Sequence, residues 1–135
     1  MKRIRSIAAV VVCGYWALAG CSTGDSPGPA GAGQAAEAFA AAVTGQPDAA
    51  CALVAPGTVK ELVDSSGSCA KGITDADLPR AGRALDVEVF GLDAIVRLEH
   101  DTMFLAFFDS GWRVTAAGCT PEARERPYSC DLKGA

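Results

Sequence analysis

Cysteine is the residue whose chemistry stands out in this chain, which has six cysteines and one histidine among 135 residues. A cysteine can pair in a disulfide, bind a metal as its thiolate or carry a covalent modification. No spacing between these cysteines resembles a zinc site, and the histidine, His100, lies far along the chain from each of them. We therefore expect no bound metal and no cofactor, and assign the cysteines to disulfides and modification.

Acid–base chemistry has few candidates. His100 and Asp101 are adjacent, and histidine titrates near neutral pH. They fall in an expected hairpin turn, however, where polar side chains normally face water. The acids Asp86, Glu88 and Glu99 lie on expected strands and alternate with apolar residues, the pattern of a solvated face. We therefore predict no catalytic residue.

The N-terminus has the pattern of an export signal. Lys2, Arg3 and Arg5 precede an uncharged run from Ile7 to Ala19. This run is shorter than the roughly 20 residues that span a bilayer. A basic head, a short apolar middle and small residues at the end are typical of a secretory signal peptide. We predict that residues 1–20 form such a peptide and are removed.

The end of that run, Leu18-Ala19-Gly20-Cys21, resembles the lipobox of bacterial lipoproteins. The resemblance implies cleavage between Gly20 and Cys21 and attachment of a diacylglycerol to the Cys21 thiol. Two acyl chains hold a protein on a membrane durably, whereas one chain binds only marginally. The expected location is therefore the extracytoplasmic face of the cell membrane. An ordinary signal peptide cut elsewhere and an uncleaved N-terminal anchor are the alternatives.

The rest of the chain is acidic. Residues 1–20 hold three of the 12 basic residues and none of the 16 acidic ones, so 9 basic and 16 acidic side chains remain, a formal charge of −7. This charge opposes binding to nucleic acid and to an anionic membrane surface. Residues 22–33 are rich in Ser, Gly and Pro, and we predict a flexible tether over 21–33. One domain over 34–135 follows.

Four cysteines remain in this domain, Cys51, Cys69, Cys119 and Cys130. An even number in an exported domain indicates two disulfides, for which three pairings are possible. We favour Cys51–Cys69 and Cys119–Cys130, because each of these bonds closes a local loop within one structural region.

The first half of the domain has helical patterns. Alanine-rich sequence predicts a helix that ends at Gly45, with Phe39 on its buried side. Three further helical segments are expected: one that starts at Pro47, one with Thr58 and Glu61 in a capping box and Gly67 at its end, and one turn between Cys69 and Leu78.

From residue 84 the apolar residues alternate with a period of two, which predicts strands over 84–90, 94–99, 102–109 and 112–117. On the first strand, Leu85 is expected on the same side as the valines that follow it. The third strand is apolar on both faces, which is typical of a strand covered on both sides. The fold class is thus α+β, with N-terminal helices packed on a curved antiparallel meander of at least four strands.

Helices followed by a curved antiparallel sheet resemble the nuclear transport factor 2-like (cystatin-like) architecture. The segments PAGRALDVEVFG, FFDSGWRVTAAGCTP and RPYSCDLKG resemble parts of small, uncharacterised actinobacterial lipoproteins. The resemblance implies this fold and a membrane location, and it brings no established activity. The broader architecture hosts isomerases, dehydratases and purely binding proteins, so it does not decide function.

Four aromatic residues, Phe104, Phe107, Phe108 and Trp112, gather around the third strand and the following hairpin. We expect them in the core, with the wall of an apolar pocket as the alternative. The predicted function is a lipid-anchored binding or interaction module without catalysis, which binds an unknown protein or small molecule. The alternatives are a small isomerase- or dehydratase-like enzyme with a carboxylate in an apolar cavity, and an accessory subunit of a membrane complex.

Overall fold

The structure, a computed structural model, describes residues 27–122 and 127–134. The predicted signal peptide, Cys21 and the first part of the tether lie outside the described residues.

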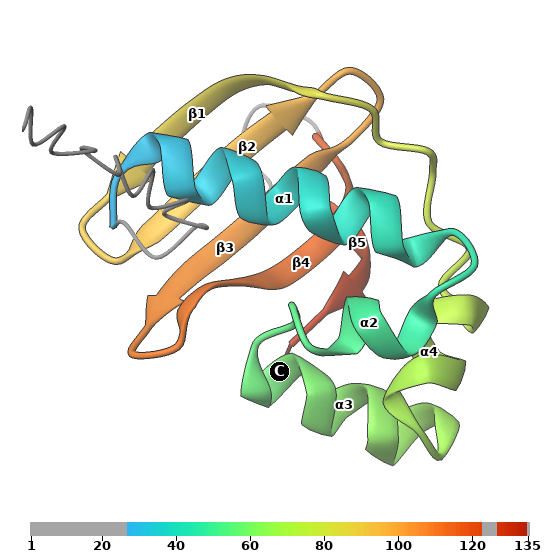
Figure 1. The fold of residues 1–135 in the computed structure, drawn as a ribbon. Helices are drawn as coiled ribbons and strands as arrows, with labels where there is room; N and C mark the ends of the chain where they lie inside the picture. The colour runs from blue at the N-terminus through green and yellow to red at the C-terminus, as the bar shows by residue number, and fades with distance from the viewer. Residues whose placement is uncertain (1–26, 123–126, 135) are drawn as a thin grey trace, which may run out of the picture.

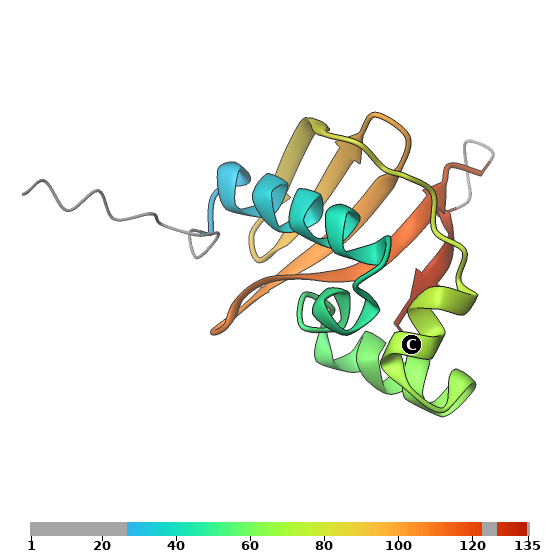
Figure 2. The same ribbon diagram turned by 45° about the vertical axis from the view of Figure 1, so that its right-hand side comes forward.

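Within the described residues, four helices precede five strands, which confirms the α+β class. The helices are α1 (Pro29–Val43), α2 (Pro47–Cys51), α3 (Pro56–Ser66) and α4 (Cys69–Asp75), and the strands are β1 (Ala84–Phe90), β2 (Asp93–Leu98), β3 (Thr102–Phe108), β4 (Gly111–Thr120) and β5 (Ser129–Lys133). The strands lie side by side in the order of the sequence, each antiparallel to the next. Helix α1 crosses one face of the sheet, and α2, α3 and α4 lie next to the β4–β5 side (Figures 1 and 2).

Helix α1 corrects the predicted tether, because it begins at Pro29, and residues 29–33 are helical rather than flexible. Proline is tolerated in the first turn, where its missing N–H has no helical partner. Gly31 and Gly33 are buried there, and a Cβ built on Gly33 would lie 3.4 Å from the Val87 side chain of β1. The first turns of α1 therefore pack against β1 at ordinary van der Waals distance, so the domain starts at α1.

The core lies between α1 and the sheet. Phe39 is fully buried on the inner side of α1, as predicted, and Trp112 of β4 is the largest buried side chain. The other fully or almost fully buried large residues come from α4 and four strands: Ile73, Val96, Met103, Leu105, Val114 and Leu132. Alternate residues of β2 and β3 thus face the helices, and no helix of the described residues covers the opposite face (Figure 2).

Strand β1 departs from simple alternation. The register against β2 shifts between Ala84 and Asp86, which leaves Leu85 exposed, so its predicted place beside Val87 and Val89 is wrong. An extra residue at a β-bulge changes which side chains face the core, and Ala84 takes the inner position instead.

Both predicted disulfides are confirmed. Cys51–Cys69 joins the last residue of α2 to the first residue of α4, with Cα atoms 6.1 Å apart. Cys119–Cys130 joins directly opposite positions of β4 and β5, with Cα atoms 4.0 Å apart. β5 was not predicted as a strand: its burial does alternate, but only Cys130 and Leu132 of its five residues are apolar, which is too short a pattern to stand out in a charged tail.

The helical half of the chain is fixed to β4 by backbone hydrogen bonds. The Val114 N–H donates to the Leu53 carbonyl (2.8 Å), and the Val114 carbonyl accepts from the Ala55 N–H (2.8 Å). One turn later, the buried Thr58 hydroxyl donates to the Thr115 carbonyl (2.9 Å). The predicted capping box is therefore wrong: α3 begins at Pro56, and Thr58 faces the sheet from inside its first turn.

Replacing Thr58 by valine tests this junction. Thr58→Val keeps the shape of the side chain but removes a buried donor, and should lower the free energy of unfolding by about 1 kcal/mol in urea denaturation. The loss is modest because the Thr115 carbonyl keeps its second donor, the Gly134 N–H (3.2 Å). The matched control is Thr74→Val, whose exposed hydroxyl bonds within α4 and should change stability by less than about 0.5 kcal/mol. Equal losses of free energy of unfolding in Thr58→Val and Thr74→Val would contradict the role of the Thr58 hydroxyl in joining α3 to β4.

Candidate functional site

The face of the sheet that no described helix covers carries an apolar strip. Ile95 of β2 lies directly opposite Phe104 of β3, and Phe104 lies opposite Ala116 of β4. Ala106 lies two residues along β3 on the same face, and all four side chains are half-buried. We call these four residues the open-face strip. The predicted covering of β3 on both sides is wrong for the part of the chain that the structure describes, because no helix of that part lies on its outer face, where the contacts come from neighbouring strands and from the segment before β5.

One of those neighbours comes from the segment that leads into β5. The ring of Tyr128 meets the ring of Phe104 edge-on, with centroids 5.1 Å apart. Such edge-to-face pairs are favourable because the positive ring edge meets the negative ring face. The contact restrains Phe104 and holds an aromatic surface at the middle of the face.

Charged residues flank the open-face strip on the side of β1. The Arg97 guanidinium donates to the Asp86 carboxylate (2.7 Å) and to the Glu88 carboxylate (2.9 Å) across the two strands. The hydrogen bonds that Arg97 donates to Glu88 and, second in effect, to Asp86 raise the pKa of Arg97 above its ordinary value. The two acids are therefore surface ion-pair partners, as the alternating pattern predicted, and neither points into a cavity.

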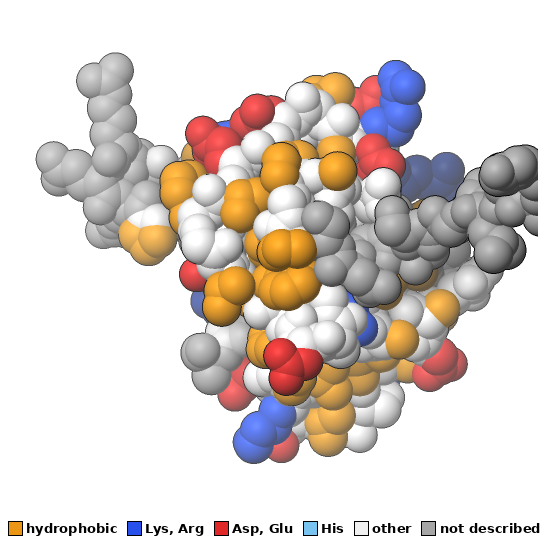
Figure 3. Space-filling view, turned by 60° about the vertical axis from the view of Figure 1, so that its left-hand side comes forward, with side chains coloured by type: hydrophobic (Ala, Val, Ile, Leu, Met, Phe, Trp, Pro, Cys, Tyr) orange, Lys and Arg blue, Asp and Glu red, His pale blue; other side chains and the backbone are white. Residues whose placement is uncertain are grey.

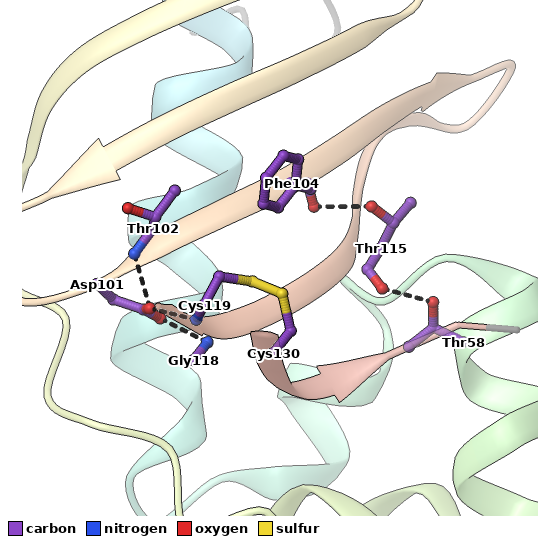
Figure 4. Close-up of a disulfide and its surroundings, with 8 residues drawn as sticks. All are labelled: Thr58, Asp101, Thr102, Phe104, Thr115, Gly118, Cys119 and Cys130. Carbon is purple, nitrogen blue, oxygen red and sulfur yellow. Dashed lines mark hydrogen bonds between the residues drawn. A yellow bond between two sulfur atoms is a disulfide. The ribbon is translucent and has the colours of Figure 1, made fainter. Parts of the chain in front are cut away.

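Asp101 has a different environment from the one predicted for a turn. Its half-buried carboxylate accepts from three backbone N–H groups: those of Thr102 (2.7 Å), Gly118 (3.0 Å) and Cys119 (3.1 Å) (Figure 4). Gly118 has a φ of +65° and no partner in the β4–β5 register, so the carboxylate fastens an irregular point of β4. The expectation that this side chain faces water is therefore wrong.

The electrostatics of Asp101 follow from this position. Partial burial raises its pKa, the three N–H groups lower it, and nearby Asp131 raises it again; burial is the largest effect and the pKa is raised overall. His100 is exposed, and its backbone N–H donates to the Ala81 carbonyl (2.9 Å). Because the Asp101 carboxylate is directed to the β4 backbone, the structure gives the adjacent pair no acid–base geometry.

The four aromatic residues singled out in the sequence lie on two sides of the sheet. Phe107 and Trp112 face the helices and pack edge-to-face with centroids 5.2 Å apart, which is the predicted core role. Phe104 and Phe108 belong to the opposite face, where Phe108 is exposed. The four therefore do not line one pocket.

A surface cleft of about 400 Å³ lies between α1 and the loop that precedes β1. It is lined by Glu37, Ala40, Ala41, Thr44, Arg80, Ala81, Gly82 and Arg83. The Glu37 carboxylate accepts from the Ala84 N–H (2.8 Å), and the Glu99 carboxylate accepts from the Arg83 N–H (2.9 Å). Both acids therefore fix the loop to its surroundings. A second cleft, of about 380 Å³, lies where α1 and α2 meet the end of α4.

Neither of these clefts contains a phenylalanine or a buried carboxylate. Within residues 27–122 and 127–134, no three His, Cys, Asp or Glu side chains are grouped to hold a metal ion. In the same part of the chain, every helix is too short or too polar to cross a membrane.

Comparison with known proteins gives no match: no family model, curated protein or solved structure is significantly similar to this chain. The similarity to actinobacterial lipoproteins and to the nuclear transport factor 2-like architecture therefore stays a prediction from the sequence.

The raised pKa of Asp101 predicts a pH dependence of stability. The folded state holds this proton more tightly than the unfolded chain, so the carboxyl contributes stability at pH values below 3.8, its ordinary pKa, and that contribution is lost as pH rises through the folded-state pKa. Relative to Asp101→Asn, which cannot ionise, the wild-type protein should lose free energy of unfolding as the pH rises from below 3.8 through the raised folded-state pKa. Urea denaturation across this range measures the difference.

The control for this measurement is Asp109→Asn, which changes an exposed carboxylate in the next hairpin turn. Its stability difference from wild type should vary much less with pH. The quantity to follow is the free energy of unfolding of wild type minus that of Asp101→Asn. If this difference stays constant or increases as the pH rises, the burial of the Asp101 carboxylate is not what sets its pKa.

Proposed function

We propose that this protein is a lipid-anchored binding module at the extracytoplasmic face of the cell membrane, and that it acts through the open face of its sheet rather than by catalysis. The open-face strip is the single observation that carries the binding role. The anchor is the diacylglycerol on Cys21 that the lipobox-like sequence implies.

Cysteine usage supports the location. All four cysteines of the described residues are paired in disulfides, which suggests an oxidising, extracytoplasmic environment. Cys13 and Cys21 lie in the part of the sequence predicted to direct export. The lipobox-like motif assigns Cys21 to lipid and removes Cys13 with the signal peptide.

The composition of the open face supports a protein partner. Aromatic and aliphatic side chains occupy its middle, and the ion pairs of Arg97 lie at its side. Protein interfaces are commonly built in this way, with an apolar, aromatic centre and a polar rim. The face is broad and convergent polar groups are absent from its four-residue strip, which fits a protein better than a small molecule.

The enzyme alternative has less support. It requires a carboxylate in an apolar cavity, whereas Asp86 and Glu88 pair with Arg97, and Glu37 and Glu99 bind loop N–H groups. The accessory-subunit alternative uses the same open face and differs only in the identity of the partner, a resident protein of the membrane.

Cys21→Ser tests the anchor. The variant should lose metabolic labelling by fatty acid and move from the membrane fraction to the soluble fraction, because no thiol remains for the diacylglycerol. Cys13→Ser is the matched control and should keep both labelling and membrane association. Persistent lipid labelling of Cys21→Ser, or an unmodified first residue in the intact mass of the natural protein, would refute the anchor.

Site-specific photocrosslinking tests the open face. A photoreactive amino acid at Ala106 should give a discrete crosslinked protein in intact cells, and the same group at exposed Val63 of α3 should not. Adding Ile95→Lys should reduce the Ala106 crosslink about tenfold, since a buried apolar contact is replaced by a charge. The Ile95→Lys variant must keep the urea midpoint of the parent protein, which shows that it is still folded. If its Ala106 crosslink is then unchanged, the open face is not the binding surface.

A further inference from the structure

Three large apolar side chains are exposed at one end of the sheet. Phe90 (59% exposed) is the last residue of β1, Leu92 (62%) lies in the turn between β1 and β2, and Phe108 (37%) is the last residue of β3. The Phe107 N–H donates to the Leu92 carbonyl (2.7 Å), so the first turn is held against the end of β3. We call Phe90, Leu92 and Phe108 the apolar tips.

The chain enters the domain at the same end. Helix α1 starts beside the β1–β2 hairpin, and the β3–β4 hairpin extends in the same direction (Figures 1 and 2). When this side is turned forward, apolar side chains gather over it (Figure 3). The start of α1 and the apolar tips therefore share one end of the molecule.

The distance to the anchor is short. Only residues 22–28 separate Cys21 from the first residue of α1, and seven residues reach no more than about 25 Å in any conformation. A diacylglycerol on Cys21 would hold this end of the domain next to the bilayer. The correction of the tether, from residue 33 back to residue 28, is what brings the tips within reach of the lipid.

We propose that the apolar tips insert into the lipid surface to which Cys21 anchors the chain. This inference rests on the anchor of the proposed function, and it adds a second contact between the domain and the membrane. The tips would enter the boundary of headgroups and acyl chains to a depth of about 5–10 Å, the usual depth of interfacial apolar side chains.

The docking is hydrophobic rather than electrostatic. Asp93 follows the first turn and Asp109 lies in the second, and both are exposed. The Arg113 guanidinium donates to the Ser110 carbonyl of the second turn (2.7 Å), so these two turns carry two acids against one base and offer no excess of positive charge to anionic lipid. Aromatic side chains are favoured at the membrane interface, and burial of Phe and Leu is favourable without any charge. Docking should therefore occur on zwitterionic lipid and resist salt.

Three apolar side chains can hold the domain on the membrane only because the anchor keeps them close to it. A link of seven residues to an anchored Cys21 would raise the effective concentration of the tips at the surface to about the millimolar range. Weak intrinsic affinity then suffices, and a chain without lipid should not stay bound. The strands point toward the bilayer in this arrangement, which leaves the open face at the side, accessible to a partner.

A tryptophan placed at a tip tests the insertion. The chain from Cys21 to Ala135, whose other cysteines are paired, is coupled through the Cys21 thiol to a maleimide phospholipid in phosphatidylcholine vesicles. In Phe90→Trp, bromine atoms on the upper part of the acyl chains should quench the added fluorescence strongly, and 1 M salt should not reverse it. Trp112 is buried and supplies a constant background.

The matched control is Leu85→Trp, on the same strand but at the end away from the hairpin. Leu85 is 69% exposed, more than Phe90, so exposure alone would give it at least equal quenching. Weak quenching of Leu85→Trp beside strong quenching of Phe90→Trp supports insertion. A loss of the Phe90→Trp quenching when Leu92→Asp is added also supports it. Equal quenching at both positions, or none at Phe90→Trp, overturns it.

The coupling is chemical, so the result does not depend on acylation in cells. An unacylated Cys21 in the natural protein would overturn the anchor and leave this measurement unaffected. The remaining outcome is that a tryptophan at a tip is not quenched on vesicles, while a photoreactive group at the same tip crosslinks to a protein in cells. This result would assign the apolar tips to a protein partner and would overturn the membrane inference.

Discussion

The two backbone hydrogen bonds of Val114 are the contact on which the rest of this structure depends. Through them the segment before α3 lies along β4, so β4 is bonded on one side to β3 and on the other to the helical half and then to β5. Thr58 repeats the connection through its hydroxyl. Buried backbone groups must be paired, and this arrangement pairs the β4 edge while it joins helices and sheet into one unit.

The same need for pairing explains what the acidic residues do. Asp101, Glu37 and Glu99 direct their carboxylates to backbone N–H groups of irregular segments, near Gly118 and in the loop before β1. An acidic chain thus uses several of its carboxylates to hold turns and loops in place. What remains for recognition is apolar, namely the open-face strip and the apolar tips. The two surfaces suit different tasks, because one lies on the flank of the sheet and the other at the end nearest the anchor.

Periodicity predicted the elements well where one face of an element meets the core. The helix around Phe39 and the first four strands from residue 84 onward appear as expected, and local loop closure gave the right disulfides. The errors share a cause. Leu85 is displaced by a bulge, Thr58 is drawn to β4 instead of capping a helix, and Asp101 meets a strand 17 residues away. Each depends on a partner that is distant in sequence, which no local pattern contains.

The sequence by itself determined the α+β order, the cysteine pairing and a location hypothesis, because these follow from local periodicity, loop length and the composition of the N-terminus. Only the tertiary structure decided that Gly31 and Gly33 lie in a buried helix, that Phe104 faces outward while Phe107 faces the core, and that Phe90, Leu92 and Phe108 meet at one end. These outcomes depend on register, bulges and the packing of α1 on the sheet. They are set by contacts between segments far apart in the chain, so they could not be predicted from any segment alone.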